Sequence, residues 1–206
     1  MTGTIIAIAA SYLLGSVSFS ILFARWLRKI DIREHGSGNA GATNTLRVLG
    51  KGPAIAVFLL DIAKGVVAVL LGRALMGDDY AWLPVVCGLA SIAGHNWPIF
   101  FRFKGGKGIA TTVGAMIALA FVPVLIAGMT AILIIALTRY VSLGSMIFAV
   151  LLPIILAIGG WDRPMIWGAV IVAVLAVVRH RKNIVKLLNG TENKLGGSKK
   201  GEPHGV

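Results

Sequence analysis

IATTVGAMIALAFVPVLIAGMTAILIIALT, residues 109–138, contains no charged side chain. A membrane span needs about 20 mostly apolar residues, so this stretch is long enough to cross a bilayer. Further apolar windows occur along the chain, at residues 4–24, 53–76, 82–101, 143–159 and 165–178. Repeated windows of this length predict an all-α, polytopic integral membrane protein, a helical bundle.

The overall composition indicates the same class. The chain has 206 residues, of which 57% are hydrophobic and only 14% charged, and its mean hydropathy is +0.86. Soluble domains average about 45–50% apolar and about 25% charged residues. These values exclude a disordered chain and an ordinary nucleic-acid-binding domain. Cys87 is the only cysteine, which excludes an intrachain disulfide and a thiolate metal cluster.

Basic residues give the orientation, since loops rich in Lys and Arg stay in the cytoplasm. Residues 25–51 carry six basic and two acidic side chains, residues 102–107 carry three basic ones, and residues 179–200 carry seven. We therefore expect the N-terminus outside and the C-terminus in the cytoplasm. An acidic turn at residues 77–79 is expected outside.

This assignment requires an odd number of crossings. It is met if residues 109–138 split near Pro123 into two short helices of about 15 residues, which gives about seven transmembrane helices. The alternative is a partial or re-entrant pair. Residues 1–195 then form one transmembrane domain, and residues 196–206 form a disordered cytoplasmic tail, because they are rich in Gly, Ser and Lys.

The first cytoplasmic segment, HGSGNAGATN at residues 35–44, is followed by Arg47. Small residues let the backbone approach a ligand closely, and the polar side chains between them supply hydrogen bonds, a combination typical of an anion pocket. The candidate ligand-binding residues here are Ser37, Gly38, Asn39, Thr43, Asn44 and Arg47. A dinucleotide-binding reading of the glycines fails, because no strand precedes them.

The second segment, FKGGKGIATT at residues 103–112, lies where a loop enters a helix. Free N–H groups at a helix N-terminus attract phosphate, and lysines beside them strengthen this attraction. The candidates are Lys104, Gly105, Gly106, Lys107 and Gly108. The segment is not a P-loop, since Gly108 stands where Ser or Thr is required. The preceding His95-Asn-Trp-Pro98 is ambiguous between an interfacial anchor and part of the pocket.

The third segment follows the last span. On a helix that continues from the span, His180 and Asn183 share one face and reach the same ligand. Glu192 either neutralises a nearby cation or closes the segment structurally. Other polar groups are Arg139, Ser142 and Ser145 at a short cytoplasmic connection, and Asp61 with Lys64 inside a span. Intramembrane charges are usually paired, so the last two predict a structural clasp or part of a polar site.

Together these motifs resemble the bacterial acyl-phosphate-dependent glycerol-3-phosphate acyltransferases. The resemblance covers nearly the whole chain, from His35–Arg47 through Phe103–Thr112 and Arg139–Ser145 to Arg179–Glu192. It implies transfer of a fatty acyl group from acyl phosphate to the 1-hydroxyl of sn-glycerol 3-phosphate, without cofactor or metal. It also implies a bacterial cytoplasmic (inner) membrane location, and hand-off from an acyl-phosphate-forming enzyme and to a second acyltransferase.

The resemblance also implies residue roles. Ser37 and Arg47 match catalytic or substrate-orienting positions, Lys107 matches the phosphate-binding loop, His180 and Asn183 match essential polar positions, and Glu192 matches a structural one. Direct attack by the glycerol hydroxyl is expected, with His180 or the acceptor's own phosphate as base. A covalent acyl-Ser37 intermediate is the alternative within this chemistry.

Two other classes compete with an enzyme. A carrier for a phosphorylated solute would suit the Asp61–Lys64 pair, but its polar groups would not crowd one membrane face. A non-catalytic assembly factor would tolerate substitution of Ser37 or Arg47.

Overall fold

The described residues of the chain fold into helices joined by loops. A computed structural model describes residues 2–76 and 82–196, and within these ranges it contains no strand. The α-helices are α1 (Thr2–Ser16), α2 (Phe19–Arg28), α3 (Ala42–Leu49), α4 (Lys51–Met76), α5 (Trp82–Asn96), α6 (Ile109–Leu119), α7 (Phe121–Thr138), α8 (Val141–Ile158), α9 (Arg163–Arg179) and α10 (Arg181–Leu188). Two short 3-10 helices cover Ile32–Glu34 and Ile99–Phe101. The all-α prediction is confirmed.

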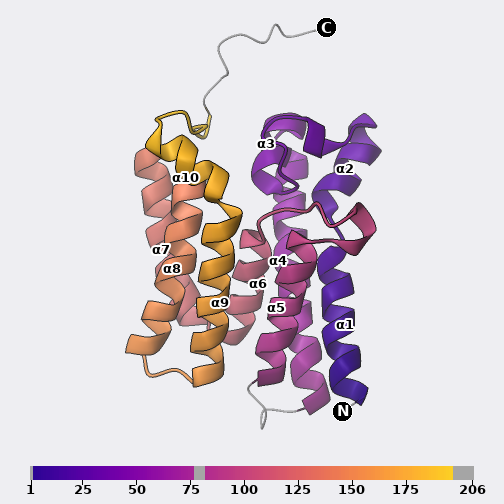
Figure 1. Ribbon diagram of the computed structural model, residues 1–206, viewed down its shortest axis with the longest axis vertical. Coiled ribbons are helices and arrows are strands. Elements are labelled where there is room, and N and C mark those ends of the chain that lie inside the picture. The colour runs from indigo at the N-terminus through magenta and orange to yellow at the C-terminus, as the bar shows by residue number, and fades with distance from the viewer. Residues whose placement is uncertain (1, 77–81, 197–206) are drawn as a thin grey trace, which may run out of the picture.

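The long helices lie side by side along the long axis of the molecule (Figure 1). Helix α4 packs on α5 and α6, α1 packs on α5, and α8 packs on α7 and α9. The short helices α2, α3 and α10 gather with the loop before α6 at the end opposite the N-terminus (Figure 1). The three polar segments singled out in the sequence therefore occupy one end of the bundle. The predicted acidic turn at residues 77–79, and the tail after Gly196, lie outside the described residues.

Four helical stretches in the described part of the chain are long and apolar enough to cross a membrane. They are Thr2–Arg28 (α1 with α2), Lys51–Leu75, Phe121–Thr138 and Val141–Ile158. The bent pair α9 and α10 makes a fifth if it is taken as one span. A multi-pass membrane protein follows from these lengths, while the number of crossings predicted from charge, seven, stays a prediction.

The first apolar stretch is not one continuous helix. It breaks at Val17 and Ser18, between α1 and α2. Ser16 Oγ donates to the Tyr12 carbonyl at 2.9 Å, and serines compete in this way with the helical backbone pattern. The break releases the Val17 carbonyl from the helix, and Lys64 Nζ donates to it at 2.9 Å.

The stretch at residues 109–138 does split, but not into two equal helices. The break is at Ala120, three residues before Pro123, which lies in the first turn of α7, where proline is tolerated. Helix α6 has 11 residues and α7 has 18. At 1.5 Å per residue α6 is about 16 Å long, roughly half of a hydrocarbon core. The partial pair therefore describes this region better than two helices of about 15 residues.

Two further helix ends differ from the prediction. Helix α5 stops at Asn96 instead of residue 101, because Pro98 cannot continue a helix and restricts the residue before it. The helix expected to continue past residue 179 ends at Arg179 and bends by 58° into α10. The continuous helix is therefore wrong, but His180 caps α10 and its carbonyl accepts from the Asn183 and Ile184 amides, so the two residues still lie one helical turn apart.

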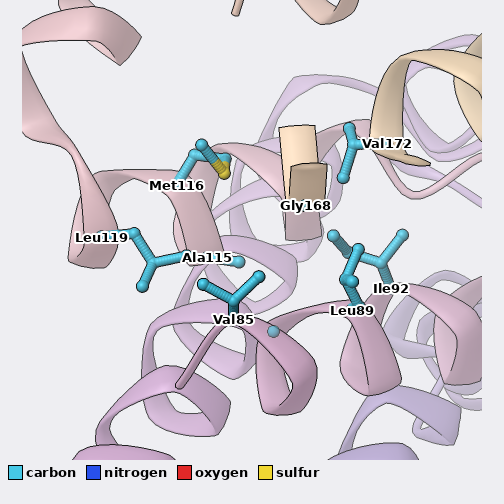
Figure 2. A pocket seen from close by; sticks show the side chains of 9 residues that line it. Val85, Leu89, Ile92, Ala115, Met116, Leu119, Gly168 and Val172 are labelled. Atoms are coloured by element: carbon cyan, nitrogen blue, oxygen red, sulfur yellow. The ribbon is translucent and has the colours of Figure 1, made fainter. Parts of the chain in front are cut away.

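The interior between α5, α6 and α9 is closely packed. Figure 2 shows Val85, Met116, Gly168 and their neighbours around an apolar cavity of about 10 Å³. A Cβ on Gly168 would lie 2.5 Å from Val85 Cγ1, so this glycine lets α9 approach α5. About one water fills such a volume, so an acyl chain finds no room there.

Glycine also sets the contact between α4 and α6. A Cβ on Gly114 would lie 1.9 Å from the Ile62 carbonyl oxygen. Small residues at such crossings let transmembrane helices pack closely, because lipid supplies little hydrophobic force between them.

We predict that Gly114→Ala forces α4 and α6 apart and destabilises the folded protein by about 1–3 kcal/mol, the usual cost of overpacking. Thermal unfolding in detergent would measure this as a lower Tm. Gly128→Ala on α7 is the matched control, because nothing lies within 4 Å of the added Cβ. An equal Tm for the two variants would contradict the packing described here.

Candidate active site

The first polar segment is folded around the side chain of Asn44, at the start of α3. This residue is 1% exposed. Its Nδ2 donates to the carbonyls of Ile32 at 3.1 Å and His35 at 3.0 Å, and its Oδ1 accepts from the Ser37 amide at 2.8 Å. The structure therefore commits Asn44, predicted to bind substrate, to holding the loop, and direct ligand contact would require these bonds to change.

That scaffold presents Ser37 to solvent. Gly36 and Gly38 have φ angles of 62° and 73°, in the left-handed region that favours glycine, and Ser37 lies exposed between them. Arg47 is exposed on α3, and Asn39 and Thr43 are half-buried. Ser37 and Arg47 are therefore available to a ligand from outside.

The second segment is held by its backbone. The Gly106 amide donates to the His95 carbonyl at 3.1 Å, and the Gly106 carbonyl accepts from Arg179 Nη2 at 2.6 Å and Nε at 3.2 Å. A third bond joins Arg179 Nη2 to the Gly105 carbonyl at 3.3 Å. Gly108, with a φ of 78°, then begins α6. The loop is therefore fixed with the N-terminal amides of α6 beside it, an arrangement that favours anions.

The first two segments meet at Gly106. A Cβ there would lie 2.4 Å from the Ala40 carbonyl oxygen. Arg33 also bridges the segments, because its Nη1 donates to the Phe101 carbonyl at 2.9 Å and its guanidinium pairs with Asp31 at 2.6 Å. The hydrogen bonds from Arg33 lower the pKa of Asp31 to about 2.

A polar hollow of about 630 Å³ opens along this seam. It is lined by Arg25, Asp31, Arg33, Glu34, Gly38, Phe100, Phe101, Arg102, Lys104 and Gly105. Four of these side chains are basic and two are acidic, so the hollow favours negatively charged ligands. It brings the predicted residues Gly38, Lys104 and Gly105 to one opening.

Lys107 links the second segment to the third. Its Nζ donates to Asn183 Oδ1 at 2.5 Å, and Asn183 Nδ2 donates to Glu192 Oε1 at 2.7 Å. Burial lowers the pKa of Lys107 to about 8; Glu192 opposes this shift, while the charges of Arg47 and Arg179 add to it. Lys107 is thus charged at neutral pH, within electrostatic reach of Arg47.

His180 lies at the bend between α9 and α10. It is 2% exposed, and its Nδ1 lies 2.7 Å from the Ala176 carbonyl oxygen, which can only accept. The proton therefore belongs on Nδ1, and Nε2 is left as an acceptor. Burial, followed by the charge of Lys107, lowers the pKa of His180 to about 4. The ring is neutral at pH 7 and has an unprotonated nitrogen.

The C-terminal segment covers the connection between α7 and α8. Ser142 Oγ donates to Glu192 Oε1 at 3.0 Å, and Arg139 Nη2 donates to the Leu195 carbonyl at 2.7 Å. Ser145 donates to the Val141 carbonyl of its own helix at 2.8 Å. Arg139, Ser142 and Ser145, predicted to bind substrate, therefore contact protein groups here, and their ligand-binding role stays a prediction.

Sequence reasoning missed two residues that position the site. His95 was left ambiguous, yet it supports Gly106, and Arg179 was one cation in a row, yet it holds the Gly105–Gly106 carbonyls. No spacing rule relates residues 95, 106 and 179, because tertiary packing alone brings them together. The predicted Asp61–Lys64 pair does form, at 2.7 Å and fully buried.

Fold and site together define a polytopic helical membrane protein with a cationic, glycine-rich site at one end. The glycerol-3-phosphate acyltransferase family matches residues 5–190, so the chain belongs to that family. The resemblance seen in the sequence is confirmed.

Relatives and solved structures agree with this assignment. Glycerol-3-phosphate acyltransferase of Shouchella clausii (strain KSM-K16) is 58% identical over 189 residues, covering 90% of this chain and 92% of the relative. The glycerol-3-phosphate acyltransferase of Halalkalibacterium halodurans is 53% identical over 196 residues, covering 93% of this chain and 95% of the relative. The crystal structure of PlsY (YgiH), an integral membrane glycerol 3-phosphate acyltransferase in its glycerol 3-phosphate form, is 38% identical, with a TM-score of 0.89 over 94% of this chain and 96% of that one. Its lysophosphatidic acid form is 37% identical, with a TM-score of 0.86 over 94% and 95%.

Proposed function

We propose that this protein transfers a fatty acyl group from acyl phosphate to the 1-hydroxyl of sn-glycerol 3-phosphate, producing lysophosphatidic acid and inorganic phosphate. The observation that carries the proposal is the contact of Lys107, in the glycine-rich loop, with Asn183 of the third segment, beside the N-terminus of α6. The names of the solved PlsY forms, with glycerol 3-phosphate and with lysophosphatidic acid, support this acceptor and this product.

The chemistry suits a cationic site without a cofactor. The glycerol hydroxyl oxygen forms a bond to the acyl carbonyl carbon, the bond from that carbon to the phosphate oxygen breaks, and phosphate leaves. Both substrates are anions and the mixed anhydride is already activated, so positioning and charge stabilisation supply much of the acceleration. Arg47, Lys104 and Lys107 are the cations assigned to this role.

The hydroxyl proton needs an acceptor. His180 is neutral at pH 7 and its Nε2 is the acceptor nitrogen, so it is one candidate for the general base, although a pKa of about 4 makes it a weak one. The acceptor's own phosphate is the second candidate. Ser37 is exposed, and its side chain has no hydrogen bond to a histidine among the described residues, which favours orientation of substrate over nucleophilic attack by Ser37.

The site belongs on the cytoplasmic face of a bacterial cytoplasmic membrane. The basic segments that the positive-inside rule retains in the cytoplasm lie at the end of the bundle that carries the site (Figure 1). An enzyme that makes acyl phosphate would supply the donor, and a second acyltransferase would consume the product.

We predict that purified protein in lipid releases phosphate from palmitoyl phosphate only when glycerol 3-phosphate is present. Arg47→Ala and Lys107→Ala should each lower kcat/KM about a hundredfold or more, because each removes a cation that neutralises the leaving phosphate. Lys51→Ala, an exposed cation at the start of α4, is the matched control. An active wild type with unchanged Arg47→Ala and Lys107→Ala variants would refute the assigned roles, and solute uptake without turnover would favour a carrier.

We predict that kcat/KM falls at alkaline pH as Lys107 loses its proton. The ammonium is present below its pKa of about 8 and is lost above it, so the rate should fall about tenfold per pH unit beyond that point. Lys107→Arg should shift this decline upward, since a guanidinium stays charged. Initial rates measured from about pH 7 to 9.5 test this, with Lys51→Arg expected to keep the wild-type profile.

We predict that no acyl group accumulates on the protein when palmitoyl phosphate is supplied alone, because direct attack needs no covalent intermediate. Intact-protein mass spectrometry after rapid quenching measures this, with Ser37→Ala as the reference. A palmitoyl adduct on wild type that is lost in Ser37→Ala would contradict direct attack.

A further inference from the structure

Three ionisable side chains form a buried cluster next to the glycine-rich loop at residues 103–108. Lys64 Nζ lies 2.7 Å from Asp61 Oδ1 and 3.0 Å from His95 Nδ1, while His95 Nδ1 lies 3.5 Å from Asp61 Oδ1. Asp61 and Lys64 are 1% and 2% exposed, and His95 is 6% exposed. The first two belong to α4 and the third to α5, so the cluster joins two long helices.

Lys64 contacts three groups at once. Its ammonium forms an ion pair with Asp61 Oδ1, and it donates to His95 Nδ1 and, at 2.9 Å, to the Val17 carbonyl at the break between α1 and α2. An ammonium has only donors, so His95 Nδ1 must accept, and the imidazole proton must lie on Nε2. The Asp61–Lys64 pair thereby fixes both the tautomer and the orientation of the His95 ring.

The far edge of that ring supports Gly106. A Cβ on Gly106 would lie 2.2 Å from His95 Nε2, and the Gly106 amide donates to the His95 carbonyl. The ring and the backbone carbonyl of His95 therefore define where Gly106 lies. Arg179, at the end of α9, holds the Gly106 carbonyl from the other side.

A clasp between helices does not require charges. A buried ion pair is costly to desolvate, and well-packed apolar residues of similar volume often hold helices as well or better. The pair is placed against the imidazole ring that lies beside Gly106, so a role in the site accounts for its position.

We propose that Asp61 and Lys64 are positioning residues, which act through His95 to hold Gly105 and Gly106 in the conformation that binds phosphate. The expected effect of these residues on catalysis rests on the proposed function. Their expected effect on the order of the loop at residues 103–108 does not.

The test is the double variant Asp61→Leu with Lys64→Met, which removes both charges at similar volume and so avoids leaving one buried charge unpaired. Hydrogen exchange followed by mass spectrometry reports the loop, and phosphate release reports the reaction. We expect peptides covering 103–108 to exchange about tenfold faster, with α4 and α5 still protected. We expect KM for glycerol 3-phosphate to rise about tenfold and kcat to change less, because loss of phosphate binding acts mainly on KM.

A second variant, His95→Leu, keeps the Asp61–Lys64 pair and tests the same loop if the double variant fails to fold. It should also speed exchange at 103–108. If a folded variant keeps the wild-type exchange rate at 103–108 and the wild-type KM for glycerol 3-phosphate, the proposal is overturned. The cluster would then only hold the helices together. If wild type releases no phosphate, the proposed function fails, and loop exchange alone still decides this inference.

Discussion

The close approach of the Gly106 backbone to the end of α5 is the constraint on which the polar end depends. The amide of Gly106 bonds to His95, its carbonyl bonds to Arg179, and the space for a side chain is taken by His95 and Ala40. Three chain segments far apart in sequence thus converge on one residue without a Cβ. Close packing of this kind leaves backbone amides and Lys107 facing the site, which a bulkier loop would cover.

A chain of hydrogen bonds continues from Lys107, next to Gly106, into the segment that follows α9. Lys107 bonds to Asn183, Asn183 to Glu192, and Glu192 to Ser142 on α8. Burial lowers the pKa of Lys107 to about 8, but the ammonium donates a hydrogen bond to the Asn183 amide oxygen and the charge of Glu192 favours its protonated form. A cation that is partly desolvated before substrate arrives interacts more strongly with a phosphate than one in water. The chain of contacts therefore explains both the position and the readiness of this side chain.

Much of this arrangement was predictable, because lipid imposes simple rules. Apolar windows gave an all-α membrane bundle, and clustered cations indicated that the polar segments share one end. Pro123 predicted the second break to within three residues, at Ala120, whereas the break at Val17–Ser18 was not predicted, because hydropathy does not report local serine bonding. The bend between α9 and α10 was not predicted, because it leaves no mark such as proline in the sequence. The roles of His95, Arg179 and Asn44 arise from contacts across 7 or more residues and needed coordinates.

The central claim is that the contact at Gly106 creates the anion site, and glycerol 3-phosphate binding to Gly106→Ala tests it most directly. The added Cβ would lie 2.2 Å from His95 Nε2 and 2.4 Å from the Ala40 carbonyl, so the loop must move. Isothermal calorimetry in lipid nanodiscs should give a Kd raised about tenfold or more, since misplaced contacts lose phosphate binding. Gly52→Ala, at the same end with nothing within 4 Å, should keep the wild-type Kd. An unchanged Kd in a folded Gly106→Ala protein would contradict the account.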